Sequence, residues 1–108
     1  MPVSEDAMHE LRQVCPGAQE MVEAGISYIY LPGLKHPSAP GSLDGLLCPQ
    51  LYGGYTTRLF LSAAVPGKGS NWSTHTILGR LWHTWSWNNV PANQRPAEML
   101  AQHLRALR

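Results

Sequence analysis

Residues 43–61, LDGLLCPQLYGGYTTRLFL, contain two apolar segments that are separated by a proline and a glycine-rich loop. Segment 43–48 predicts a strand that Pro49 ends, because proline has no N–H group to donate to a neighbouring strand. Segment 57–61 has apolar residues on both of its faces, which indicates a strand covered at least partly on both sides. Since a short link joins the two strands, we expect them to pair antiparallel within a meander.

Helices are predicted at both ends of the chain. At the start, residues 4–14 have a capping serine at Ser4. The apolar face of this helix is expected to contain Ala7, Met8, Leu11 and Val14. At the end, residues 93–107 predict a helix with Asn93 as its cap and Pro96 in its first turn. Its apolar stripe is expected to contain Met99, Leu100, His103, Leu104 and Leu107.

Two further strands are predicted between the first helix and residue 43. Segments 19–23 and 26–31 favour a hairpin that turns at Ala24 and Gly25. The second strand is expected to end at 31–34, LPGL, and a loop is expected over 36–42. Turns or loops are also expected over 51–55 and 66–70. The predicted order is an N-terminal helix, an antiparallel meander of three to four strands, a Trp-rich segment and a C-terminal helix, which is an α+β architecture.

The Trp-rich segment 71–91, NWSTHTILGRLWHTWSWNNVP, permits two interpretations. Ser73 could cap a helix through Trp82, because apolar residues recur there at helical spacing. The alternation of Trp85 and Trp87 is instead typical of an extended segment. With only one phenylalanine in the chain, the four tryptophans are expected to fill much of the core, and any exposed share would mark a protein-docking surface.

The composition indicates one globular domain over residues 1–108 and restricts the possible functions. Apolar residues make up 44% of the chain, charged residues 14%, and the net charge is +1, so neither disorder nor a basic nucleic-acid surface is indicated. We expect no signal peptide, and no apolar segment approaches the roughly 20 residues of a membrane helix. With two cysteines, Cys15 and Cys48, we expect a cytoplasmic protein with free thiols and no cofactor.

Cys48 is the main candidate for chemistry, because a side chain at the end of a strand can reach a cleft. A cysteine nucleophile acts as the thiolate and needs a base or a positive environment. The candidate partners are His75 and His83, while His103 is expected to be structural and His9 exposed. The alternative is that Cys48 is an ordinary buried cysteine that packs as a small apolar residue. Cys48, His75 and His83 could also supply three zinc ligands, although their spacing matches no known zinc motif.

Residues 48–60, CPQLYGGYTTRLF, resemble the signature of ubiquitin-conjugating enzymes. In that signature a strand ends in proline, a short loop holds a tyrosine, and the next strand begins with a small residue; Pro49 and Tyr55 stand at the matching positions. The segment from Trp72 through GRLWHTWSWNNVP to the final helix is similar to the divergent bacterial ubiquitin-conjugating-enzyme-like (UBC-like) family, the prokaryotic family E type. The resemblance covers about residues 28–107 and implies a UBC-like fold.

The resemblance implies a carrier of a ubiquitin-like modifier in a bacterial modification system. Some systems of this kind are linked to antiphage defence. The carrier receives the modifier from an adenylating enzyme as a thioester, here on Cys48 with His83 or His75 as partner, and transfers it to an amine of a target protein. This chain departs from the eukaryotic pattern, because it has no His-Pro-Asn tripeptide and no cysteine after Cys48. The alternative is a non-catalytic UBC-like module that docks the activating enzyme or the modifier. Neither interpretation involves nucleic acid or a membrane.

Overall fold

The computed structural model describes residues 4–35, 41–49, 55–63, 72–85, 90 and 94–106. These residues form an α+β fold in which helix α1 (Glu5–Val14) precedes a six-stranded antiparallel sheet and helix α2 (Pro96–Ala106) follows it. The strands are β1 (Gln19–Glu23), β2 (Ile26–Lys35), β3 (Ser42–Cys48), β4 (Arg58–Leu61), β5 (Trp72–Ile77) and β6 (Arg80–Trp85). Their order across the sheet is β1-β2-β3-β4-β6-β5, so the predicted meander is confirmed and a further hairpin extends it.

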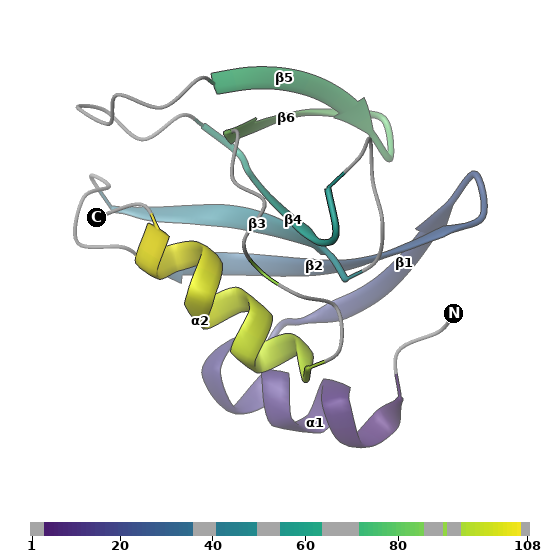
Figure 1. Ribbon diagram of the computed structural model, residues 1–108, viewed down its shortest axis with the longest axis vertical. Helices are drawn as coiled ribbons and strands as arrows, with labels where there is room; N and C mark the ends of the chain where they lie inside the picture. The colour runs from purple at the N-terminus through teal and green to yellow at the C-terminus, as the bar shows by residue number, and fades with distance from the viewer. Residues whose placement is uncertain are drawn as a thin grey trace.

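The sheet separates two hydrophobic cores, because side chains alternate between the faces of each strand. The two helices lie together on one face, and the β5–β6 hairpin curls over the other (Figure 1). The helix-side core joins Met8 and Leu11 of α1 and Met99 and Leu100 of α2 to the strands. The hairpin-side core consists of Tyr28, Leu46, Cys48, Phe60, Ile77 and Trp82. All four residues of β4 are buried, which confirms that this strand is covered on both faces.

Helix α1 begins at the predicted cap. The Ser4 hydroxyl accepts a hydrogen bond from the backbone N–H of Ala7 at 3.2 Å, which satisfies one of the free donors of the first turn. The predicted apolar positions Ala7, Met8 and Leu11 are buried. Val14 is 67% exposed, so the prediction for this residue is wrong. Its side chain borders an open apolar groove beside α2 and does not enter the closed core.

Helix α2 starts at Pro96, a little later than predicted, and proline is well tolerated at a first helical position. The Glu98 carboxylate accepts a hydrogen bond from the backbone N–H of Arg95 at 3.3 Å, which fixes the start of the helix. Met99, Leu100 and His103 are buried as predicted, and Leu104 packs against the helix-side core. The predicted cap Asn93 and the last apolar position Leu107 lie outside the described residues. None of the helices that the structure describes is long and apolar enough to cross a membrane.

The β1–β2 hairpin turns at Ala24 and Gly25 as predicted, with positive φ values of 53° and 77°. The prediction that β2 ends at 31–34 is wrong, because Leu34 still pairs with Leu43 of β3. The register shifts between Leu31 and Leu34, and Gly33 has a φ of 72° there. The strand therefore continues past Pro32 by forming a bulge, and Gly33 can adopt the positive φ that this bulge requires. The loop expected over 36–42 falls largely outside the described residues, and Ser42 already belongs to β3.

The helix predicted from Ser73 to Trp82 is wrong, since this segment forms the antiparallel hairpin β5–β6. The turn lies at Leu78 and Gly79, which both have positive φ, at 55° and 72°. That geometry matches the twist of paired strands, and glycine adopts it without strain. The alternative of an extended second half is correct through Trp85, while Trp87 lies outside the described residues. The turns predicted at 51–55 and 66–70 lie wholly or mostly outside them.

Candidate functional site

Cys48 is the last residue of β3, as the sequence predicts, but its side chain does not reach the surface. It is 0% exposed and lies in the hairpin-side core. Leu46 and Phe60 flank it from the meander, and Trp82 belongs to the same cluster from β6. In this conformation the sulfur is enclosed mainly by hydrocarbon and aromatic groups.

A buried cation lies directly opposite Cys48. Arg58 pairs with Cys48 in the β3–β4 register, which places both side chains on the same face of the sheet. Arg58 is only 6% exposed, and its guanidinium carbon lies 3.9 Å from the ring centroid of Tyr55 and 6.0 Å from that of Phe60. Aromatic faces attract such a cation when it is withdrawn from water. A guanidinium in this position favours a negatively charged neighbour, whereas complete burial disfavours any charge.

His75 lies on the same face as Cys48 and Arg58. Its ring packs edge-on against Phe60 with 5.6 Å between the ring centroids, and its Nε2 atom is 3.4 Å from the Ser73 hydroxyl. Burial, followed by the positive charge of Arg58, lowers the pKa of His75 below its ordinary value of 6.5. The imidazole is therefore neutral at pH 7 and has the protonation state that a general base requires.

His83 lies on the opposite face of the sheet from Cys48. It pairs in register with Leu61 of β4, and Leu61 belongs to the helix-side core. Since paired residues share a face, the His83 side chain points away from the hairpin-side core. The structure therefore places Cys48 and His75 on one face of the sheet and His83 on the other.

Arg58 is the residue of this cluster that the sequence did not single out. The alternation in 57–61 puts Arg58 and Phe60 on one face, and this placement is correct. The sequence does not show the strand register that places Arg58 opposite Cys48. The signal that could have identified Arg58 is a charged residue inside an otherwise apolar strand.

His103 is buried, as expected for a residue that packs in the core, and His9 is exposed as expected. The Thr57 hydroxyl donates to the carbonyl of Val90 at 2.9 Å, so the Nε2–H of His103 donates to Thr57 Oγ1, also at 2.9 Å. The His103 ring also packs edge-on against Trp85, with centroids 6.2 Å apart. Burial, with a smaller contribution from Arg58, lowers the pKa of His103 to about 4. His103 is thus a neutral imidazole inside the helix-side core.

Neither cysteine is in a disulfide, and the zinc hypothesis receives no support. Among the described residues, which include Cys48, His75 and His83, no three histidine, cysteine or acidic side chains are close enough to hold a metal ion. The Cys15 thiol donates to the carbonyl of Pro32 at 3.3 Å. Burial raises the pKa of Cys15 above its ordinary value, so this thiol is poorly reactive.

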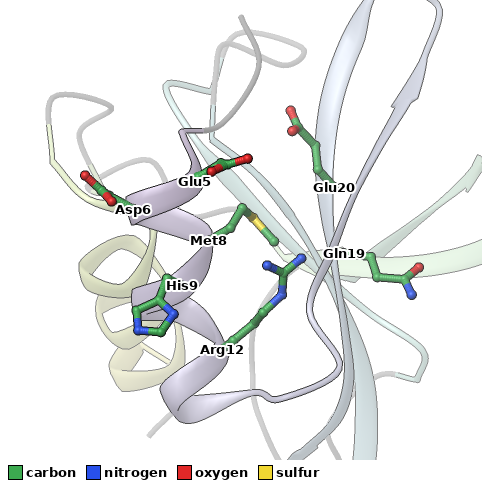
Figure 2. A pocket seen from close by; sticks show the side chains of 7 residues that line it. All are labelled: Glu5, Asp6, Met8, His9, Arg12, Gln19 and Glu20. Atoms are coloured by element: carbon green, nitrogen blue, oxygen red, sulfur yellow. The ribbon is translucent and has the colours of Figure 1, made fainter.

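Two surface grooves lie away from the predicted site residues. A polar groove of about 690 Å³ separates α1 from β1, and Figure 2 shows Arg12 and Met8 reaching from the helix toward the strand. Arg12 is held there, because its Nε donates to the carbonyl of Ala18 at 3.0 Å. A smaller, apolar groove of about 440 Å³ lies beside α2 and is lined by Val14 and Leu100 among others. Neither groove is lined by Cys48, His75 or His83.

Comparison of this chain with protein-family models, with curated proteins and with solved structures finds no match.

Proposed function

We propose that this chain is a UBC-like domain of a bacterial ubiquitin-like modification system, and that it docks the activating enzyme or the modifier without forming a thioester. The fold assignment is supported by the order of elements, because α1 precedes the consecutive meander β1-β2-β3-β4 and α2 closes the chain. Pro49 follows β3 and Tyr55 precedes β4, as in the conjugating-enzyme signature. The β5–β6 hairpin extends the sheet beyond that meander.

The complete burial of Cys48 is the observation that favours docking over catalysis. A thioester forms when a thiolate attacks the activated carboxyl terminus of the modifier, so the sulfur must meet a second protein. A sulfur that is 0% exposed is out of reach of any acyl group while the hairpin-side core stays closed. The closed conformation is therefore consistent with a binding module.

Thioester transfer is the second candidate, and the Arg58–Cys48 pair favours it. In this reaction the Cys48 thiolate attacks the thioester carbonyl on the activating enzyme, a new C–S bond forms on Cys48, and the enzyme's thiolate leaves. A target amine then attacks the carbonyl of the Cys48 thioester, which yields an amide and releases the thiol. Arg58 would stabilise the thiolate, and the neutral His75 would accept the proton of the amine. This route requires that Cys48 first becomes exposed.

One experiment separates the two candidates. The chain is incubated with a ubiquitin-like modifier, its adenylating enzyme and ATP, as wild type, Cys48→Ala, Cys48→Ser and a Cys15→Ala control. Docking predicts that wild type and Cys48→Ala bind the adenylating enzyme or the modifier equally and form no adduct. The carrier predicts a reducible adduct that Cys48→Ala abolishes, Cys15→Ala retains and Cys48→Ser converts to a reduction-resistant ester. Absence of both binding and adduct would remove both candidates.

A further inference from the structure

We propose that the outer part of the β5–β6 hairpin, residues 74–83, is a lid over Cys48 that opens before the protein unfolds globally. We call the two contacts that hold its tip, the Arg80–Asp44 ion pair and the Leu78–Glu23 hydrogen bond, the clasp. The inference concerns how the thiol is reached, and it holds for either of the two proposed functions.

The lid supplies one wall of the core that encloses Cys48. Ile77 and Trp82 of the hairpin are 2% exposed each and belong to the same cluster as Cys48 and Phe60. His75 adds its ring against Phe60. Movement of residues 74–83 away from the meander would therefore expose the Cys48 sulfur while the meander remains paired.

The base of the hairpin is anchored on the other face of the sheet. Trp72 and Trp85 pair across the two strands with their ring centroids 5.4 Å apart. Trp85 is part of the helix-side core, and Trp72 packs against it. The base and the tip are thus held by different cores, which allows the tip to release while the base stays in place.

Within the part of the chain that the structure describes, few backbone contacts attach the hairpin to the meander. β6 shares one residue pair with β4, Leu61 with His83, and the Thr84 hydroxyl donates to the carbonyl of Leu59 at 2.8 Å. Neighbouring strands β3 and β4 share four residue pairs by contrast. Elements joined to the rest of a fold by few backbone contacts open at lower free energy than the global unfolding.

The clasp connects the tip of the lid to the meander. Arg80 Nη1 lies 3.0 Å from Asp44 Oδ2, and the backbone N–H of Leu78 donates to Glu23 Oε2 at 2.6 Å. Both partners belong to the meander, and the tips of the two hairpins lie at the same end of the molecule (Figure 1).

Asp44 is held in place as the partner of Arg80. Its carboxylate also accepts hydrogen bonds from the Tyr30 hydroxyl and the backbone N–H of Gly33, both at 3.2 Å. Arg80 in turn covers the Trp82 ring, with 4.7 Å from its guanidinium carbon to the centroid. Loss of Arg80 would therefore loosen the tip and uncover the tryptophan that closes the core.

The test is site-resolved labelling of the two buried thiols by 4,4′-dithiodipyridine, an uncharged reagent, under native conditions. Mass spectrometry of the peptides reports Cys48 and Cys15 separately, and Cys15 serves as an internal reference because it belongs to the helix-side core. We expect Cys48 to react faster than Cys15 and faster than the global unfolding measured in urea allows. Arg80→Gln should raise the Cys48 rate about 1.5- to fivefold, the usual effect of losing one partly exposed ion pair, with Cys15 unchanged.

A matched control is available in the second exposed ion pair. Arg95 Nε and Glu10 Oε1, 2.8 Å apart, join the start of α2 to α1, and their exposure resembles that of Arg80 and Asp44. Glu10→Gln should leave the Cys48 rate unchanged, while Glu23→Ala, which removes the other half of the clasp, should raise it. The proposal fails if Cys48 and Cys15 react at equal rates that follow global stability, or if Arg80→Gln and Glu23→Ala do not accelerate Cys48 beyond Glu10→Gln.

Discussion

Acidification from pH 7 to pH 4 should destabilise this fold, and His103 provides the reason. Its ring is 1% exposed and neutral, and burial, helped by the positive charge of Arg58, lowers its pKa from 6.5 to about 4. In the unfolded chain the imidazole takes up a proton below pH 6.5, whereas in the folded chain it stays neutral until about pH 4. The contribution of the neutral histidine to the free energy of unfolding is therefore fully present above pH 6.5. It is lost progressively as the pH falls from 6.5 to 4.

The size of this effect follows from the two pKa values. A difference of one pH unit corresponds to about 1.4 kcal/mol, so the interval from 6.5 to about 4 corresponds to roughly 3 kcal/mol. That is a large part of the roughly 5–15 kcal/mol that stabilises a typical domain. Asp44 acts in a separate window, because its pKa lies below the ordinary 3.8 and its contribution is lost only at lower pH.

Urea unfolding followed by tryptophan fluorescence at several pH values between 7.5 and 4 measures the effect directly. The variant His103→Gln keeps an N–H donor for Thr57 but cannot be protonated, so its stability should depend much less on pH over this range. His9→Gln, at an exposed histidine, is the control and should behave as wild type. A wild-type stability that is constant from pH 7 to pH 4.5, or a His103→Gln variant with the wild-type pH dependence, would refute the reasoning.

Three further outcomes are expected. Thr57→Val leaves the Val90 carbonyl and the His103 N–H buried without the hydroxyl that joins them, so the free energy of unfolding in urea should fall by about 2 kcal/mol; a change below 0.5 kcal/mol would contradict that network. Arg58→Gln removes the cation that lowers the pKa of both His75 and His103, so both pKa values should rise in an NMR titration, and unchanged values would show that burial alone sets them. Ser4→Ala removes the cap of α1 and should cost about 1 kcal/mol in thermal or urea unfolding, whereas Ser4→Asp, which can still cap the helix, should retain stability.

The parts of the fold that the sequence predicted correctly depend on neighbouring residues. The start of α1 follows from a serine whose hydroxyl meets an N–H three residues later. The β1–β2 turn follows from the glycine at position 25, and the meander from apolar segments joined by short links. Each of these signals acts over a few residues, so no knowledge of the rest of the chain was needed.

The wrong helix prediction over 73–82 arose because the same residues satisfy two periodicities. Ile77, Leu78, Leu81 and Trp82 fit helical spacing, yet in the hairpin Ile77 and Trp82 are buried while Leu81 is 53% exposed. Ile77 and Trp82 pack against residues of β3 and β4, which lie far away in the sequence. The local spacing of apolar residues carries no information about that contact. The continuation of β2 beyond Pro32 has a similar origin, since pairing with β3 outweighs the proline as a stop signal.

The sequence by itself determined an N-terminal helix, an antiparallel meander with Cys48 at the end of a strand, and a C-terminal helix. Only the tertiary structure decided what surrounds that cysteine. Its burial depends on Trp82, 34 positions later in the chain, and its charged neighbour depends on the register that opposes it to Arg58. The choice between His75 and His83 rests on which face each residue occupies after β6 joins β4, and a shift of one residue would exchange them. Strand pairing and sheet curvature are cooperative properties of the whole chain, so they are not present in any single segment.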